Sequence, residues 1–411
     1  VIDLSSTTDQ VTQINGAVNS VATTNFESFD ASGFTGSQTV SVTGSDEANT
    51  IVGTANADTI VAGKGNDTIT GGDGVDTLLG GAGDDTFIFT ALSDLTDGSN
   101  SVEDTITGGA GTNYLQLNGG ITLSGSDDFT SKASDLDTIT TNAGDTGALS
   151  LTLHATIASD TGISAIDLSA ETNGSRSNVI DMTNMSTTTA FSVIGTSGAD
   201  TIDAEETHAT TIKGGPGVDV IDLTGGTTVD IIDVTGAHGT GGTAATGNYD
   251  TVANFVVAND LLRLDASATT LSTASGSAAV VEDEGAASLA TNGQAYNLAG
   301  LLTLATNAVD LVTLDTTVLA NVGNLDAGGT INDGTELLKS LVASGQISAS
   351  GITVDNAGDS FYILTDDGTD SYLYFVDSGA DTLAVASEIQ LVADFGGATL
   401  DGLGATEISI A

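Results

Sequence analysis

An unbroken nine-residue repeat is the feature that most constrains the fold of this chain. Five consecutive units occupy residues 44–88, with Asn or Asp at position six, Thr at position seven and a large apolar residue at position eight. Successive side chains of a strand point to opposite faces, so position eight faces inward and position seven outward. Two units complete one coil, so turns on the same side belong to units n and n+2. The inward residues are Ile51, Ile60, Ile69, Leu78 and Phe87.

The turns of this repeat have the composition of a cation site. Glycines at positions one, two and four are expected to take positive φ, which lets six residues form a tight turn with inward carbonyls. Position-six carboxylates on the same side, in pairs 49/67, 58/76 and 67/85, stack at strand spacing of about 4.8 Å and need a cation or a proton. Carboxylate and carbonyl oxygens are the ligands that Ca²⁺ takes. The predicted site residues here are Asn49, Asp58, Gly63, Gly65, Asp67, Gly72, Gly74, Asp76, Gly81, Gly83 and Asp85.

The pattern G-G-x-G-x-D-x-U-x closely resembles the nonapeptide of the RTX (repeats-in-toxin) family, which implies a parallel β-roll that binds Ca²⁺. Weaker copies follow at 99–107 and 108–116, and Asp104 at position six joins the predicted site. A second block contains units at 195–203 and 214–222 around a ten-residue variant. Its predicted ligands are Asp200 and Asp219, as same-side partners.

We expect an all-β chain in which parallel β-roll blocks are joined to strand-rich β domains, with a few short helices in the C-terminal region. ISAIDLS at 163–169 matches FESFDAS at 26–32, and Gly195 follows Gly44 by 151 residues, so the order strands, roll, strands, roll indicates a duplicated module. The predicted divisions are a β lead-in at 1–43, a first roll at 44–116, a strand-rich region at 117–194, a second roll at 195–265 and a C-terminal β-rich domain at 266–411.

Four local expectations complete the fold prediction. Residues 249–265 resemble the segment that closes many RTX rolls, with Val252, Phe255, Leu261, Leu262 and Leu264 sealing the core. Two helices are expected, near 295–307 and 335–344. A hairpin is expected at 361–377. The C-terminal end, acidic and then apolar (EISIA), resembles an uncleaved type I secretion signal.

Charge and cysteine content limit the partners. The 411 residues carry 55 acidic and 6 basic side chains, a formal net charge of -49. This charge excludes nucleic acid and anionic membranes as direct electrostatic partners. A chain that repels itself so strongly stays expanded until cations neutralise it, so folding and calcium binding are expected to be one event. No cysteine is present, and calcium would replace disulfides as the cross-link. The longest apolar stretch, 296–314, is interrupted by polar residues, so no transmembrane helix is expected.

No catalytic motif accompanies the repeats, and we expect no enzyme activity. The three histidines, His154, His208 and His238, form no H-E-x-x-H motif, and no G-x-S-x-G motif occurs. Each histidine is expected to be a solvated loop residue.

The whole composition resembles the S-layer proteins of Gram-negative bacteria, which carry RTX repeats and are exported by a type I system. That resemblance implies a secreted structural protein that binds copies of itself in a calcium-dependent two-dimensional lattice on the cell surface, anchored to lipopolysaccharide of the outer membrane. The alternative is a secreted RTX adhesin or extracellular matrix protein. Ice binding would need a second outward rank of Thr, but position nine is mostly Val, Leu or Ile.

Overall fold

The computed structural model divides into two compact units, 1–196 and 197–411, which are described separately. Each consists mainly of strands. The structure describes residues 2–3, 13–14, 17–18, 27–96, 102–145, 147–186, 189–204, 207–224, 228–234, 249–256, 259–264, 280–283, 309–314, 337–338, 352–353, 360–366, 370–377, 383–397, 400 and 408–410.

Unit 1 is built from parallel sheets whose strands alternate along the chain. One sheet has the order β1 (Ile2–Asp3), β5 (Ser41–Thr43), β7 (Thr59–Lys64), β9 (Thr77–Ala82), β11 (Thr105–Ala110) and β14 (Ala133–Ser134). The facing sheet has the order β4 (Ser28–Asp30), β6 (Thr50–Val52), β8 (Thr68–Thr70), β10 (Thr86–Phe89), β12 (Tyr114–Leu117), β15 (Thr138–Thr140), β17 (Ala165–Asp167) and β19 (Phe191–Ile194). A third sheet contains β13 (Thr122–Leu123), β16 (Ser150–Thr152) and β18 (Val179–Asp181), and β2 (Gln13–Ile14) pairs with β3 (Ala17–Val18).

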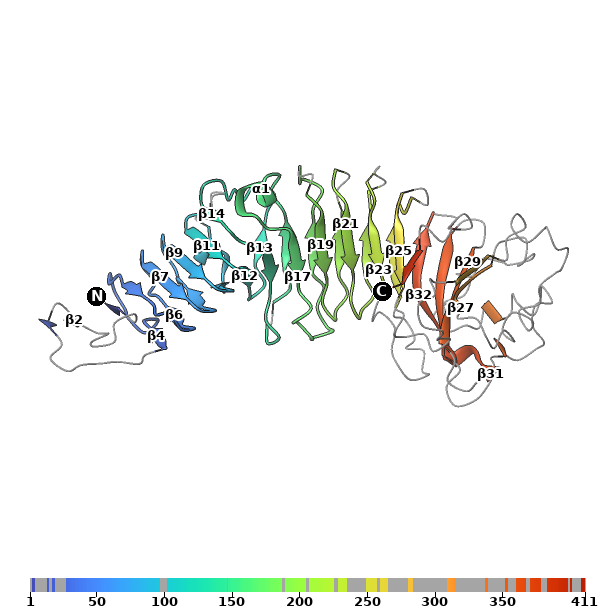
Figure 1. The fold of residues 1–411 in the computed structure, drawn as a ribbon, viewed down its shortest axis with the longest axis horizontal. Helices are drawn as coiled ribbons and strands as arrows, with labels where there is room; N and C mark the ends of the chain where they lie inside the picture. Colours follow the sequence, from blue (N-terminus) through green and yellow to red (C-terminus); the bar gives the residue numbers. More distant parts are fainter. Residues whose placement is uncertain are drawn as a thin grey trace. The chain divides into compact units, whose positions relative to one another are not determined.

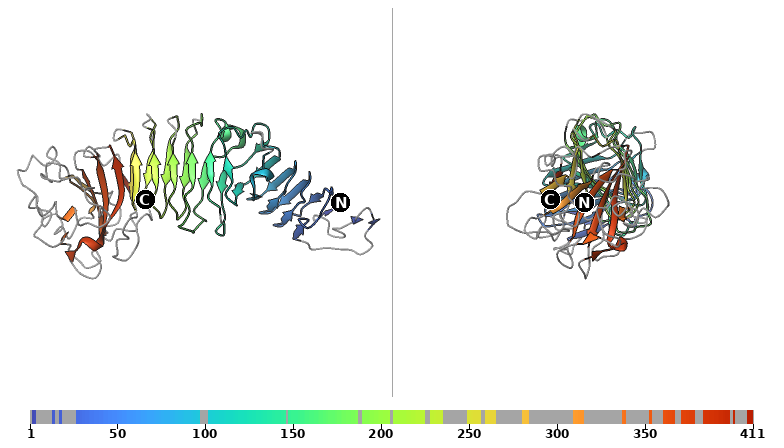
Figure 2. Two further views of the ribbon diagram at one scale, coloured as in Figure 1. Left: turned by 180° about the vertical axis from the view of Figure 1, so that it is seen from behind. Right: turned by 90° about the vertical axis from the view of Figure 1, so that its right-hand side faces the viewer.

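The register shows that two repeats make one coil, as predicted. Thr50 pairs with Thr68 and Thr68 with Thr86, while Thr59 pairs with Thr77 on the other wall. The strands from β4 to β19 lie side by side as successive rungs (Figure 1), and the view from behind shows the same stack (Figure 2). The position-eight side chains fill the space between the walls, because Ile51, Ile60, Ile69, Leu78 and Phe87 are each 0% exposed. This is the all-β parallel roll that the repeat predicts.

The stacking continues through residues 117–194. β12 pairs with β15, β15 with β17 and β17 with β19, all in parallel. The opposite wall changes, because the sheet of β7, β9 and β11 ends at β14 and the sheet of β13, β16 and β18 takes its place. The short helix α1 (Ile157–Thr161) lies beside this change of wall and ends at Gly162, whose φ is 94°. A 3-10 helix, η1 (Leu92–Asp94), occupies the insertion between β10 and β11.

Unit 2 repeats the arrangement and adds an antiparallel part. One sheet has the order β20 (Thr201–Asp203), β22 (Val220–Asp222), β24 (Asp250–Ala253), β32 (Ile389–Gly396), β30 (Ser371–Asp377), β29 (Ser360–Asp366), β27 (Val309–Leu314) and β26 (Val280–Asp283). Another contains β21 (Thr210–Lys213), β23 (Ile231–Asp233), β25 (Leu261–Leu264) and β33 (Ile408–Ile410). β28 (Ile352–Thr353) pairs with β31 (Leu383–Ala384), and η2 (Ala386–Glu388) precedes β32.

The structure confirms one of the local expectations and corrects another. The hairpin at 361–377 is confirmed as β29 and β30. Within 249–265, Val252, Phe255, Leu262 and Leu264 are buried, but Leu261 is half-exposed because it holds an outward position of β25. The segment does not end the core, since β24 pairs onward with β32 and β25 with β33.

The helix expected at 295–307 lies outside the described residues. Of 335–344, the structure describes Leu337 and Leu338, both helical, and Leu337 is 0% exposed. None of the helices in the described part of the chain has the length and apolarity that crossing a bilayer requires.

Candidate metal centre in the turns of the roll

The predicted position-six residues are buried at the ends of the turns, directly before the strands. None of those in the first roll is more than 2% exposed, although all but one are carboxylates. Burial of an unpaired carboxylate is strongly unfavourable, so each must be compensated. The set comprises Asn49, Asp58, Asp67, Asp76, Asp85 and Asp104.

These residues form two columns, one on each side of unit 1. In each column the backbone N–H of one residue donates to the carboxylate of the residue one coil further on. In the column of Asn49, Asp67, Asp85 and Asn113 the N–H to Oδ1 distances are 2.7, 2.9 and 3.1 Å. In the column of Asp58, Asp76 and Asp104 they are 2.7 and 2.7 Å. The structure thus brings together the pairs 49/67, 58/76 and 67/85 and extends both columns.

Asp104 joins its column despite an insertion in the repeat. It follows Asp76 by 28 residues rather than by 18. β11 nevertheless pairs with β9 in the same register, with Thr105 opposite Thr77. The insertion therefore lies outside the coil. Asn113, at position six of the copy at 108–116 and not among the predicted ligands, is 0% exposed. Its Oδ1 accepts the N–H of Asp85, and its own N–H donates to Asp137 Oδ2 at 2.7 Å, so this column continues to Asp137.

The second oxygen of each inner carboxylate points into its own turn. The Oδ2 atoms of Asp67, Asp76, Asp85 and Asp104 are buried and accept no hydrogen bond from the described residues. A Cβ on Gly71 would lie 2.1 Å from Asp76 Oδ2, and one on Gly80 would lie 2.3 Å from Asp85 Oδ2. Buried oxygens normally have a partner, so these mark positions for a cation or a proton.

The glycines have two different roles. Those predicted at positions two and four do take positive φ, with values of 118° and 98° at Gly63 and Gly65. Gly72, Gly74, Gly81 and Gly83 behave in the same way. The expectation was wrong for position one, where Gly71 and Gly80 have no positive φ. There glycine is required because a side chain would occupy the place of the carboxylate oxygen.

Burial makes the carboxyl groups of the columns hold protons more tightly than usual. It raises the pKa of Asp67 to about 6, that of Asp76 to about 7 and that of Asp104 to about 8, and it also raises the pKa of Asp85. The backbone N–H donors lower these values in part, while neighbouring carboxylates raise them further. Near neutral pH and without a cation, some carboxyl groups of the columns are thus protonated, and those that are ionised repel one another.

The oxygens of these turns fit Ca²⁺. Its usual ligands are six to eight oxygens from carboxylates and backbone carbonyls. Asp67, Asp76, Asp85 and Asp104 would hold it through their unpartnered oxygens, and the glycine turns leave room around them. When bound, calcium neutralises the columns and cross-links consecutive coils. The protein itself orients these ligands, because backbone N–H groups already donate to each carboxylate.

Unit 2 contains the same construction with fewer glycines. The N–H of Asp200 donates to Asp219 Oδ1 at 2.8 Å, which is the predicted same-side pair, and Asp219 N–H donates to Asp250 Oδ1 at 3.0 Å. Asp219 Oδ2 is buried without a hydrogen bond, and burial raises the pKa of Asp219 and of Asp250. A second column runs from Thr210 to Asp230 and Asp260, at 2.8 and 3.1 Å.

Sequence reasoning missed Asp230, Asp250 and Asp260. They are 1%, 6% and 2% exposed. Burial raises the pKa of Asp230 to about 6 and also raises that of Asp260. The turn before Asp230 keeps the glycines of positions one and two, Gly225 and Gly226, but not that of position four, and the segments before Asp250 and Asp260 lack all three, so the repeat did not reveal them. The available signal was an Asp followed by one outward and one buried apolar residue, as in VDIIDV, YDTVANF and NDLLRLD.

The histidines differ from expectation. His208 is 1% exposed, so it is a buried residue rather than a solvated loop residue. It lies two residues before β21, in the ten-residue variant of the repeat. His154 is half-buried, and His238 lies outside the described residues.

Taken together, the coils and their buried carboxylates define a parallel β-roll with cation-binding turns. The family model of the RTX calcium-binding nonapeptide repeat matches in 4 copies, over residues 43–78, 52–87 and 103–121. The chain therefore carries RTX calcium-binding nonapeptide repeats, and such repeats bind Ca²⁺. Proteins with such repeats are typically secreted. A comparison with curated proteins finds no match.

Proposed function

We propose that this chain is a non-catalytic structural protein of a bacterial S-layer, which assembles with copies of itself into a calcium-dependent two-dimensional lattice at the cell surface. The observation that carries the proposal is the set of buried carboxylate columns in the turns of both units. A fold that needs divalent cations at so many positions suits an environment where calcium is abundant, outside the cell.

The surface charge supports a calcium requirement for assembly as well as for folding. Edge-to-edge contacts between copies that each carry a formal charge of -49 are repulsive over about 8 Å at physiological salt. Cations that bridge or screen such a contact are needed. Carboxylates that meet only in the lattice are less preorganised than those of the columns, so assembly is expected at higher calcium than folding.

The test is one calcium titration with two measurements on the same sample. Circular dichroism follows folding, and light scattering follows assembly. We expect two separate midpoints, with folding first, and ordered sheets in electron micrographs of the end point. A folded protein that stays monomeric at millimolar calcium contradicts the lattice and favours the second candidate, a secreted adhesin or matrix protein.

Anchoring to lipopolysaccharide is a separate part of the proposal. Direct attraction between this acidic chain and an anionic glycolipid is unfavourable, so calcium is expected to mediate it. Co-sedimentation of the folded chain with lipopolysaccharide vesicles at fixed calcium tests it. Vesicles of the same lipids without the saccharide are the control, and equal sedimentation with both contradicts a saccharide anchor.

A further inference from the structure

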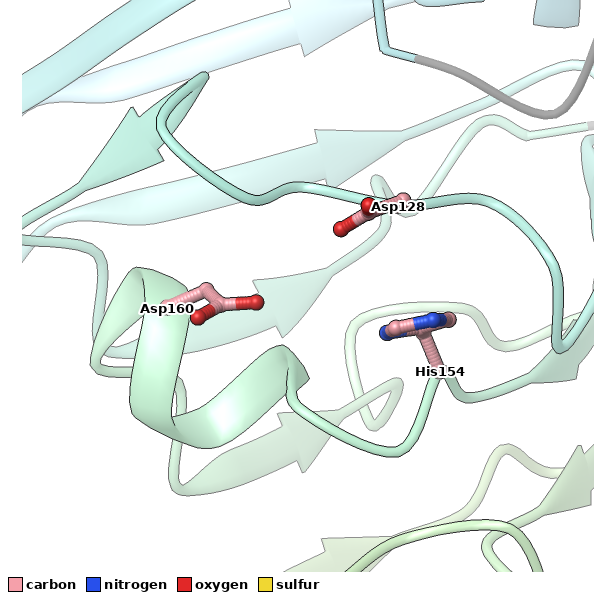
Figure 3. Close-up of side chains that lie close together, drawn as sticks. All are labelled: Asp128, His154 and Asp160. Atoms are coloured by element: carbon pink, nitrogen blue, oxygen red, sulfur yellow. The ribbon is translucent and has the colours of Figure 1, made fainter.

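A cluster of three metal-ligating side chains lies in unit 1 outside the carboxylate columns. Asp128 comes from the loop between β13 and β14, His154 follows β16, and Asp160 is on α1 (Figure 3). The three residues span the place where one wall of the roll changes sheet. Coil stacking, and not nearness in sequence, brings the two segments together.

The geometry of the cluster matches a metal site. One ligand atom from each of Asp128, His154 and Asp160 lies within 4.8 Å of the other two. All three side chains are half-buried, which leaves a route for an ion. In Figure 3 the carboxylates of Asp128 and Asp160 and the imidazole of His154 border a common space.

Two threonines link the three ligands into one chain of hydrogen bonds. Thr130 donates its N–H to Asp128 Oδ1 at 2.8 Å and its hydroxyl to Asp160 Oδ2 at 3.0 Å. Thr156 donates its hydroxyl to Asp160 Oδ2, and its Oγ1 lies 3.0 Å from His154 Nδ1. Hydrogen bonds of this kind orient metal ligands and are a regular part of metal sites.

The backbone beneath the ligands is fixed by buried neighbours. Phe129 follows Asp128, Leu153 precedes His154 and Thr161 follows Asp160, and each of these neighbours is 1% exposed. Asp127 Oδ2 also accepts the N–H of Ser124 at 2.6 Å, which closes the turn before Asp128. The ligands are therefore held by the core, as a preorganised site requires.

We propose that Asp128, His154 and Asp160 bind a first-row divalent transition-metal ion, with zinc as the expected occupant. Ca²⁺ takes oxygen ligands, whereas an imidazole together with carboxylates suits Zn²⁺. This site would differ in chemistry from the columns and would pin the β13–β14 loop to α1. Zinc would then stabilise the change of wall, which lacks the repeated glycine turns.

The contact with Thr156 specifies how His154 would bind. If Nδ1 carries the proton and donates to Thr156 Oγ1, the lone pair of Nε2 is available for the metal. The other tautomer uses Nδ1 to accept the N–H of Thr156, 3.3 Å away. Metal binding selects the first arrangement. The competing account is a metal-free charge contact between His154 and the two carboxylates.

The experiment uses the full chain held folded in millimolar calcium, with ¹⁵N-labelled histidine. The three histidines of the chain give a simple imidazole nitrogen spectrum. On addition of ZnCl₂ we expect one Nε2 resonance to shift, at one equivalent, and the shift to be absent in His154→Gln. No shift in the wild-type chain, or the same shift in His154→Gln, overturns the proposal. Because the first measurement uses the wild-type chain, it does not depend on a variant that folds.

Calorimetric zinc titrations in the same calcium buffer assign the other ligands. Asp128→Asn and Asp160→Asn should lower zinc affinity at least about 100-fold, and Thr156→Ala about 10-fold, as for loss of a residue that orients a ligand. The control is Asp167→Asn, an outward carboxylate of β17 in the same unit, which should bind zinc as the wild type does. Unchanged affinity in both carboxylate variants contradicts the assignment. Calcium-induced circular dichroism should be the same in all four variants.

Discussion

Unit 1 contains two sets of coils with the same parallel pairing, and the two sets differ in the residues at position six of the repeat. In the repeat coils, residues 44–117, that position carries buried carboxylates. In the variant coils, residues 121–194, it is filled by residues of which only one is a carboxylate. Both sets have parallel pairing and a fully buried apolar interior, as at Ile69 and Ile166. The position-six residues of the variant coils are Ile121, Ser131, Asp137, Leu149, Ser164, Asn178 and Phe191.

The comparison shows that a coil forms with a charged acceptor, a neutral acceptor or an apolar residue at this position, so it does not need a charge there. Asp85 Oδ1 accepts the N–H of Asp67 at 2.9 Å, and Asn178 Oδ1 accepts the N–H of Leu149 at 2.8 Å. The amide of Asn178 also donates to Thr196 Oγ1 at 3.2 Å. A carboxylate leaves a buried charged oxygen, whereas an amide completes its hydrogen bonds within the protein. Calcium dependence is therefore set coil by coil.

Removal of calcium should have the largest effect and should separate the two sets of coils. Without the cation the repeat coils contain several uncompensated buried carboxylates, so they are expected to unfold, and circular dichroism of the whole chain should lose the β signal of these coils. Hydrogen exchange measured by mass spectrometry in chelator should show loss of protection over 44–117 first. Loss of protection at equal rates in 121–194 would contradict the comparison, and a full β spectrum in chelator would refute coupled folding.

Lower pH should partly replace calcium in the repeat coils. The folded pKa values of Asp76 and Asp104, about 7 and about 8, lie above the ordinary value of 3.8. A raised carboxyl pKa means that the folded state binds protons more tightly than the unfolded state, so its stabilising contribution is present below pH 4 and is lost as pH rises toward 8.

In chelator we therefore expect more β structure at pH 5 than at pH 8, measured by circular dichroism. The buried carboxyl groups of the columns, whose pKa values are raised, are expected to account for the difference. Asp104→Asn keeps an acceptor for Asp76 N–H and removes the group with the highest of these values. This substitution should reduce the change in β structure between pH 7 and pH 8. The same spectrum at pH 5 and pH 8 would argue against proton uptake by the columns.

The periodic part of the molecule could be predicted from sequence because its register is unbroken. A strict nine-residue period fixes which side chains point inward and which turns stack, so the pairs 49/67, 58/76 and 67/85 follow directly. The insertion before Asp104 did not disturb the prediction, since the repeat resumes after it. The role of the position-one glycines was not predictable, because it depends on where a carboxylate oxygen points.

The stacking of the variant coils was harder to predict from the sequence, because the spacing between successive strands varies there. In the variant coils, successive position-six residues on one side are Asn113, Asp137 and Ser164, separated by unequal loops that include α1. No fixed period can be counted across them. The cluster of Asp128, His154 and Asp160 depends on this stacking, and a histidine between two distant acids is no signal by itself. Asp230 and Asp260 escaped notice because their turns do not carry the complete glycine pattern.

Within the repeat coils, Asp67→Ala should raise the calcium midpoint of folding more than Asp58→Ala does. Asp67 accepts the N–H of Asn49 and has a free buried Oδ2. Asp58 already accepts the N–H of Val40 and of Thr54, at 2.6 Å each, so both its oxygens are used. Loss of a ligand beside buried carboxylates costs roughly 1–3 kcal/mol, equal to roughly a 5- to 150-fold shift in midpoint. Equal midpoints in calcium titrations would show that the two columns are assigned wrongly.

The smallest effect should come from the variant coils and should not depend on calcium. Asn178→Ala leaves the N–H of Leu149 buried without its acceptor, which should lower the free energy of unfolding by roughly 1–3 kcal/mol. Urea denaturation monitored by hydrogen exchange over 121–194 measures it. Ser169→Ala, which alters an exposed hydroxyl bonded to Asp167 in the same coils, should change stability by less than about 0.5 kcal/mol. Because the amide carries no charge, the loss in Asn178→Ala should be equal at low and at saturating calcium. If added calcium reduces the loss, the variant coils also depend on a cation, and the division between the two sets of coils is incorrect.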